Sequence, residues 1–171
     1  MKESNIQDNT YYDPGANRAQ RVRDLFDRIA RRYDLINDVQ SGGLHRLWKR
    51  RVIREARISQ GENALDVCCG TGDLAFALAR EGAEVTGLDF SQEMLNVASK
   101  RAGSSTTDSK TTNPNFIHGD AMQLPFSDDS FDVVTMAYGL RNLSDWEKGL
   151  SELHRVLRPG ERMDKVWIGS L

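Results

Sequence analysis

Two stripes of apolar residues, separated by the break Ser41-Gly42-Gly43, predict two amphipathic helices near the start of the chain. The first stripe has helical spacing and consists of Val22, Leu25, Phe26, Ile29 and Tyr33. The second consists of Leu44, Leu47, Trp48 and Val52. Residues 1–16 are polar and contain the turn sequence Asp13-Pro14-Gly15. We therefore expect a flexible arm over 1–16, followed by a helical segment over 17–60.

From residue 61 onward, short apolar runs alternate with helical patterns. The runs predict strands at 63–68, 84–88, 115–118 and 131–137. Ser91 is a candidate N-cap of the helix between the second and third strands, and Ser144 of the helix after the fourth strand. Pro159-Gly160 is expected to stop that last helix. Residues 103–115 are rich in Ser, Thr, Asn and Lys and predict a surface loop. This alternation predicts an α/β fold, a Rossmann-like doubly wound sheet with N-terminal helices in front of it.

The end of the sequence departs from the alternating pattern. After Gly160 the only apolar run is Val166-Trp167-Ile168, which is too short to predict a strand. We therefore expect a domain over 61–171 that is truncated after about residue 160, with strands one to four present and strands five to seven largely missing. Strand four would then form an exposed sheet edge, which favours aggregation.

Composition places few limits on function. The 171 residues carry a net charge of −2 and contain no apolar run near the roughly 18 residues of a membrane span. The polar start lacks a signal-peptide core, so we expect a cytoplasmic protein, or one bound peripherally at the inner face of the membrane. The adjacent Cys68 and Cys69 suit neither a disulfide nor a zinc site, and we interpret them as small packing residues.

Charge is unevenly distributed along the chain. Residues 18–57 contain twelve Arg and Lys against five Asp and Glu, a net of +7, whereas residues 58–171 contain ten against seventeen, a net of −7. The Arg-rich segment could face anionic lipid or a nucleic acid, or it could be a solvated helix face.

The segment Leu65-Asp66-Val67-Cys68-Cys69-Gly70-Thr71-Gly72-Asp73-Leu74 lies at a predicted strand-to-helix turn, where α/β sheets bind ligands. Gly70 and Gly72 allow close approach of the backbone to a ligand. With Ala75 they fit the dinucleotide pattern G-x-G-x-x-G/A, and Asp89 follows Gly70 by nineteen residues. An acid at that place accepts hydrogen bonds from ribose hydroxyls of either a dinucleotide or S-adenosylmethionine.

Charge distinguishes the two cofactors. Asp66 and Asp73 would oppose the pyrophosphate of a dinucleotide but suit the sulfonium and ammonium groups of S-adenosylmethionine. Asp120, with Ala121, follows the third predicted strand, where it could meet the adenine. We therefore predict S-adenosylmethionine as cofactor and no metal. The predicted cofactor-binding residues are Asp66, Gly70, Thr71, Gly72, Asp89, Asp120 and Ala121.

From about Phe26 to Gly160 the chain resembles the C-methyltransferases of ubiquinone and menaquinone biosynthesis, which are class I S-adenosylmethionine-dependent methyltransferases. The glycine loop is shared by many methyltransferases, and three further motifs are more specific. These are the N-terminal Tyr33-Asp34-Leu35-Ile36-Asn37-Asp38 with Ser41 and Leu44–Arg50, then Tyr138-Gly139-Leu140-Arg141-Asn142, and then His154-Arg155-Val156-Leu157-Arg158-Pro159-Gly160.

The resemblance implies methyl transfer to a ring carbon of a prenylated quinol, of the demethylmenaquinol or 2-polyprenyl-6-methoxy-benzoquinol type. Arg141 and Asn142 then become candidate catalytic residues that polarise or orient a quinol hydroxyl, although both could instead cap the loop. His45 and Trp48 could cover the substrate or pack a helix. No nucleic-acid partner is expected, and the oligomeric state stays open. The alternatives are methylation of another small molecule, an inert fragment and, more remotely, an NAD-dependent oxidoreductase.

Overall fold

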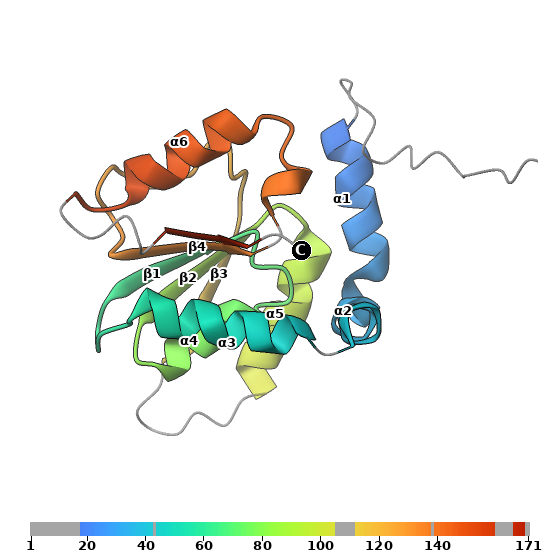
Figure 1. The fold of residues 1–171 in the computed structure, drawn as a ribbon. Helices are drawn as coiled ribbons and strands as arrows, with labels where there is room; N and C mark the ends of the chain where they lie inside the picture. Colours follow the sequence, from blue (N-terminus) through green and yellow to red (C-terminus); the bar gives the residue numbers. More distant parts are fainter. Residues whose placement is uncertain (1–17, 43, 105–111, 138, 160–165, 170–171) are drawn as a thin grey trace, which may run out of the picture.

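The chain folds around one parallel sheet (Figure 1). The strands are β1 (Asn63–Val67), β2 (Glu84–Asp89), β3 (Asn115–His118), β4 (Val133–Ala137) and β5 (Val166–Gly169). The helices are α1 (Arg18–Ile29), η2 (Ala30–Arg32), α2 (Tyr33–Ser41), α3 (Leu44–Ala56), α4 (Asp73–Arg80), α5 (Gln92–Ser104), η3 (Leu140–Asn142) and α6 (Trp146–Val156). This computed structural model describes residues 18–42, 44–104, 112–137, 139–159 and 166–169.

The strand order is β3-β2-β1-β4-β5, and all neighbouring strands are parallel. Helices α3, α4 and α5 cover one face of the sheet and α6 covers the other (Figure 1). The predicted doubly wound, Rossmann-like fold is therefore confirmed. In such sheets the direction of winding reverses beside the first strand, and the crevice outside the carboxyl ends of the strands there is the usual ligand site.

The prediction that strand four would form the sheet edge is wrong. The four-residue β5 pairs with β4 in parallel register, from Val134 opposite Val166 to Ala137 opposite Gly169. The short run Val166-Trp167-Ile168 shows no periodic pattern. A parallel strand is also stabilised by hydrogen bonds to the backbone of its neighbour, which its own side-chain pattern does not reveal. Strand five is thus present, contrary to expectation.

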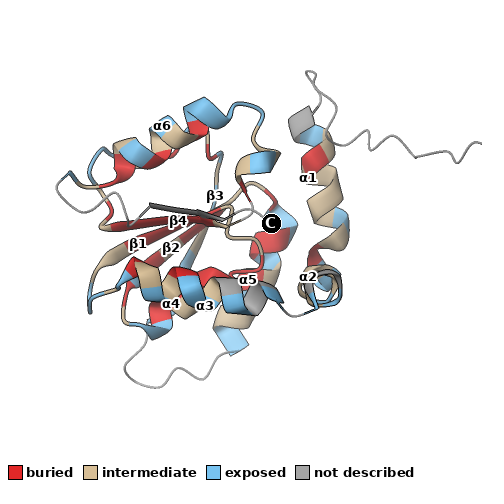
Figure 2. Ribbon diagram, viewed as in Figure 1, coloured by how far each residue is buried: buried red, intermediate tan, exposed pale blue. Residues whose placement is uncertain are grey.

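The central strands of the sheet are mostly buried (Figure 2), and their side chains contribute to one hydrophobic core on each face. On β1, Leu65 and Val67 belong to the core beneath α6, whereas Ala64 belongs to the core beneath α3 and α4. Asp66 shares the face of Ala64 because strand residues two apart point the same way. A carboxyl group therefore stands in the middle of the sheet, and only 1% of its residue surface is exposed.

The helix ends show which local predictions were accurate. Ser91 caps α5 as predicted, because its Oγ accepts a hydrogen bond from the N–H of Met94 at 3.2 Å. The prediction of Ser144 as the cap of α6 is wrong, since Asp145 Oδ1 accepts the N–H of Lys148 at 3.0 Å instead. Helix α6 also ends at Val156, before Pro159. The predicted arm over 1–16 lies outside the described residues, as does most of the predicted loop over 103–115.

Candidate functional site

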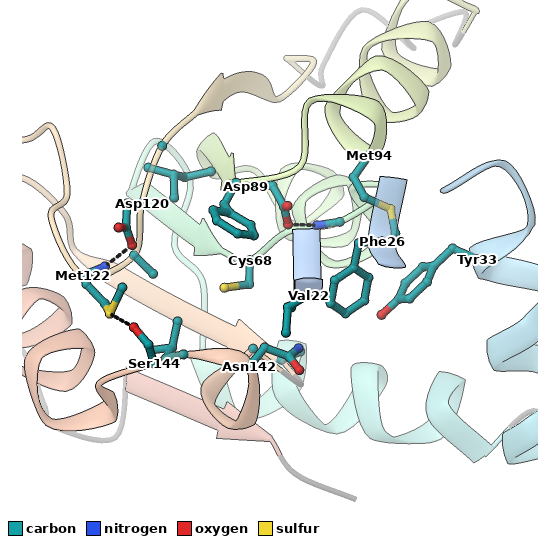
Figure 3. A pocket seen from close by; sticks show the side chains of 18 residues that line it. Val22, Phe26, Tyr33, Cys68, Asp89, Met94, Asp120, Met122, Asn142 and Ser144 are labelled. Atoms are coloured by element: carbon teal, nitrogen blue, oxygen red, sulfur yellow. Dashed lines mark hydrogen bonds between the residues drawn. The ribbon is translucent and has the colours of Figure 1, made fainter. Parts of the chain in front are cut away.

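A cavity of about 740 Å³, including its open mouth, lies at the carboxyl ends of the strands (Figure 3). Its floor comes from the segments after β1, β2, β3 and β4, and its cover from the N-terminal helices. The lining residues from the strand side are Cys68, Gly70, Leu88, Asp89, Phe90, Met94, Gly119, Asp120, Ala121, Met122, Ala137, Gly139, Asn142, Leu143 and Ser144. Those from the cover are Val22, Phe26 and Tyr33. The cavity's position at the carboxyl ends of parallel strands, and its mostly apolar lining with a few polar groups, are typical of small-molecule sites.

Asp89 joins two loops at the polar end of the cavity. Its Oδ2 accepts the N–H of Gly70 at 2.8 Å, and its Oδ1 accepts the N–H of Ser91 at 2.9 Å. Burial raises the pKa of this carboxyl group, although the backbone N–H groups oppose the rise. A carboxylate oxygen has more than one acceptor site, so the side chain can hold both loops and still accept hydrogen bonds from a ligand in the cavity.

Asp120 and Ala121 line the cavity beside Asp89, as predicted from their position after the third strand. Asp120 Oδ1 accepts the N–H of Met122 at 2.9 Å, which holds the turn in shape. Ala121 is buried, with 3% of its surface exposed, and provides a flat apolar contact. Two carboxylates therefore face the same cavity across the ends of neighbouring strands (Figure 3).

Three predicted cofactor residues lie outside the lining of this cavity. Asp66 is buried inside the sheet, where the Thr135 hydroxyl donates a hydrogen bond to its Oδ1 at 2.9 Å. Thr71 turns its hydroxyl toward Asp34 on α2, at 2.6 Å. Gly72 has φ +85° and packs so tightly that an added Cβ would lie 2.8 Å from the Phe116 ring. Their assignment as cofactor contacts stays a prediction, because the structure gives them other packing roles.

Asp73 does not face the cavity, contrary to the charge argument made from the sequence. It is the first residue of α4, and its carboxylate pairs with Lys49 on α3 at 2.7 Å and with Arg101 on α5 at 2.6 Å. These cations hold the pKa of Asp73 low despite its burial. All three residues line a second, more open hollow between the helices. Asp73 therefore does not act on a ligand in the cavity as the charge argument assumed, and the carboxylates that line the cavity are those of Asp89 and Asp120.

Both cysteines are free thiols, as expected. Burial raises the pKa of each, and the carboxylate of Asp89 adds to this effect. Cys68 is more than a packing residue, however, because it lines the cavity. Cys68 also has φ +58°, a left-handed conformation that is uncommon for residues other than glycine.

The apolar cover of the cavity was missed as a functional feature. Val22, Phe26 and Tyr33 belong to the first predicted stripe, but the sequence does not show what that stripe contacts. In the structure the rings of Phe26 and Tyr33 pack edge to face, with their centres 6.0 Å apart, and both residues line the cavity (Figure 3). Burial raises the pKa of the Tyr33 phenol, partly opposed by a hydrogen bond with Asn37.

The two candidate catalytic residues lie in η3, directly after the strand-four segment. Asn142 lines the cavity, whereas Arg141 is exposed beside it. Burial raises the pKa of Tyr33, and the charge of Arg141 partly opposes this rise, so the guanidinium group lies within electrostatic reach of the phenol. His45 and Trp48 belong to α3, but their side chains lie outside the described part of the structure.

A family model matches residues 15–168 of the chain, and its description is the ubiE/COQ5 methyltransferase family. The chain belongs to the ubiE/COQ5 methyltransferase family. Among curated relatives, the demethylmenaquinone methyltransferase of Staphylococcus aureus strain JH9 is 44% identical over 151 residues, 86% of this chain. The chain spans 60% of the length of that relative.

Solved structures resemble the chain in the same way. A SAM-dependent methyltransferase from Methanosarcina mazei has a TM-score of 0.58 and 32% identity, covering 64% of this chain and 53% of that one. The [4+2]-cyclase SpnF has a TM-score of 0.70 and 27% identity, covering 84% and 58%. The comparisons confirm the predicted family and fold class, and the description of the Methanosarcina mazei neighbour as SAM-dependent agrees with the predicted cofactor, S-adenosylmethionine. Because one neighbour is a cyclase, the fold of this ubiE/COQ5 chain does not by itself define a reaction.

Proposed function

We propose that this chain binds S-adenosylmethionine in the cavity and directs its methyl group to a ring carbon of a prenylated quinol. The observation that carries the proposal is the cavity itself, which has carboxylates at one end and an apolar cover at the other. Asp89 and Asp120 form the polar end, and Val22 and Phe26 belong to the cover. The name of the Staphylococcus aureus relative favours a demethylmenaquinol acceptor over a methoxy-benzoquinol one.

The residues at the polar end fit the cofactor. When bound, S-adenosylmethionine supplies a methyl group on a positively charged sulfur. Asp89 has acceptor capacity for ribose hydroxyls while both its oxygens hold the loops in place. The backbone of Gly70 lines the cavity and permits close approach, and Ala121 offers an apolar surface to the adenine. The two carboxylates give the cavity the negative charge that a sulfonium favours.

Residues near η3 are proposed to act on the acceptor. A quinol ring carbon becomes a better nucleophile when its neighbouring hydroxyl loses a proton. The Asn142 amide lines the cavity and can orient that hydroxyl, while the Arg141 cation stabilises the negative charge that develops on its oxygen. The raised pKa of the Tyr33 phenol keeps it protonated, so it can act as a hydrogen-bond donor.

The cofactor part is tested by calorimetric titration of the chain with S-adenosylmethionine, S-adenosylhomocysteine and NAD. We expect binding of the first two, weakened at least tenfold by Asp89→Asn. Glu84→Gln is the matched control, because Glu84 is exposed at the opposite end of the same strand. Binding of NAD alone would contradict the cofactor, and binding of none would support the inert-fragment alternative.

The acceptor part is tested by methyl transfer from labelled S-adenosylmethionine to a short-tailed demethylmenaquinol. Arg141→Ala should lower turnover at least tenfold with S-adenosylhomocysteine affinity unchanged. Arg80→Ala, at the exposed end of α4, serves as the control. Turnover equal to that of the parent chain would remove Arg141 from the proposed chemistry. Methylation of an unrelated acceptor, with none of the quinol, would favour the alternative of another small-molecule substrate.

We also propose that the N-terminal helices contact the inner surface of an anionic membrane. The enzyme would bind its prenylated quinol substrate at that surface. Four large apolar side chains on α2 and α3 are more than half exposed: Leu35, Val39, Leu44 and Leu47. Arg50 and Arg54 are also exposed on α3, and basic residues near anionic lipid contribute about 1 kcal/mol each. In the described residues no helix is both long and apolar enough to cross a bilayer.

Vesicle flotation tests this contact. We expect salt-dependent binding to vesicles containing phosphatidylglycerol, lost in the double variant Leu35→Ser, Val39→Ser. Trp146→Ser is the matched control, since Trp146 is also more than half exposed but lies on α6, across the sheet. Equal binding of all variants, or no binding of the parent chain, would contradict the membrane contact.

A further inference from the structure

The cover of the cavity is attached to the cofactor loops through two carboxylate–hydroxyl hydrogen bonds. Asp27 on α1 and Asp34 on α2 provide the carboxylates, and Ser91 and Thr71 provide the hydroxyls. Each hydroxyl belongs to a loop that carries a proposed cofactor residue. The acceptors thus lie on the cover and the donors on the body of the fold, so any opening of the cover has to break both bonds.

The first bond holds α1 to the loop after β2. Ser91 Oγ donates to Asp27 Oδ1 at 2.5 Å and also accepts the N–H of Met94, while the N–H of Ser91 donates to Asp89. Ser91 is completely buried and is fixed by these contacts to α5 and to Asp89. The guanidinium of Arg23, one turn earlier on α1, lies 4.5 Å from the centre of the Phe90 ring and supports the same attachment.

The second bond holds α2 to the glycine loop. Thr71 Oγ1 donates to Asp34 Oδ1 at 2.6 Å, and Thr71 is only 2% exposed. Arg101 on α5 strengthens the junction, because its guanidinium donates to the Thr71 carbonyl at 2.8 Å and to Asp34 Oδ2 at 3.3 Å. The same guanidinium pairs with Asp73 at 2.6 Å. The end of the cover is therefore joined to the residue that follows Gly70.

We propose that Asp27 and Asp34 are positioning residues that keep the N-terminal helices closed over the cavity and thereby limit cofactor exchange in both directions. This inference rests on the proposed binding of S-adenosylmethionine in the cavity. The cover supplies Val22, Phe26 and Tyr33 to the wall, so a ligand between it and the strand ends is enclosed when both bonds are made. Neither Asp27 nor Asp34 lines the cavity, and they act through the loops that do.

The test measures association and dissociation rates of S-adenosylhomocysteine by stopped-flow fluorescence in Asp27→Ala, Asp34→Ala and the double variant. Loss of a hydrogen bond to a charged group should raise both rates about tenfold in each single variant, with a smaller change in Kd. The control is Asp24→Ala, because Asp24 on α1 is bonded by Gln20 of the same helix, at 2.8 Å, and should leave both rates unchanged. Amide hydrogen exchange in α1 should accelerate in the Asp27 and Asp34 variants and not in Asp24→Ala.

The carboxylates are changed rather than Ser91, because Ser91 also caps α5. If an alanine variant does not fold, Asp27→Asn and Asp34→Asn keep the shape and should give intermediate rates. Rates equal to those of Asp24→Ala, or a faster dissociation with unchanged association, would overturn the proposal while leaving cofactor binding intact. A parent chain that binds neither S-adenosylhomocysteine nor S-adenosylmethionine would overturn both this inference and the proposed function.

Discussion

Replacement of Asp66 by Asn should remove a pH dependence of stability that the buried carboxyl group creates. Asp66 lies in the middle strand of the sheet, and burial raises the pKa of its side chain from 3.8 to about 7. The Thr135 hydroxyl and the charge of Lys49 oppose this rise only in part. The folded chain therefore keeps a proton on Asp66 over a pH range in which the unfolded chain has lost it.

The sign and size follow from this difference. Because the folded state binds the proton more tightly, the contribution of Asp66 is fully present below about pH 4 and is lost as the pH rises to about 7. The separation of about three pH units corresponds to about 4 kcal/mol of unfolding free energy. Most of it, about 3 kcal/mol, falls between pH 5 and pH 8.

Urea unfolding at about pH 5 and about pH 8 measures the effect. Asp66→Asn should leave stability near that of the parent chain at the lower pH and raise it by about 3 kcal/mol relative to the parent at the higher pH. Asp132→Asn is the contrasting control. Burial opposes ionisation of Asp132, but the N–H of Asn63 and the guanidinium of Arg158 outweigh it and hold the pKa low. Its loss should therefore cost the same at both pH values. An equal effect of Asp66→Asn at both pH values would refute the reasoning.

Two further predictions concern the loop after β1. Gly72→Ala should lower the unfolding free energy by about 2 kcal/mol or more in a urea titration, since the backbone has φ +85° and the new Cβ would meet the Phe116 ring. The control is Gly42→Ala, at φ +55° with open space around it, which should lower the unfolding free energy by only about 1 kcal/mol. Alkylation of Cys68 by iodoacetamide, followed by mass spectrometry, should be slow because its pKa is raised, and saturating S-adenosylhomocysteine should slow it at least tenfold further. Unchanged alkylation with bound ligand would show that Cys68 is outside the ligand site.

The fold and the polar end of the site could be predicted because they depend on features that are local in sequence. The alternation of strands and helices fixes a parallel sheet, and parallel strands bring their carboxyl ends to one edge. Asp89 and Asp120 therefore reach the same cavity although they are 31 residues apart in sequence. Their positions after successive strands were sufficient to identify them.

The remaining features depend on contacts that a sequence pattern does not contain. Asp73 is next to the glycine loop in sequence, but the first turn of α4 directs its carboxylate toward Lys49 and Arg101, far along the chain. The stripe that includes Phe26 indicates a helix face without showing that this face covers a cavity. Strand β5 depends on the backbone of β4, which its own short sequence does not report.

The left-handed backbone at Cys68 has a consequence for how ready the loop is to bind a ligand. A residue with a Cβ at φ +58° stores roughly 1 kcal/mol or more of strain, which a glycine would avoid. Glycine would also sample many more conformations in the unfolded chain. With cysteine there, fewer unfolded conformations are lost when the turn that leads into Gly70 folds. A turn that is already ordered when the ligand arrives loses less conformational entropy on binding, which favours affinity.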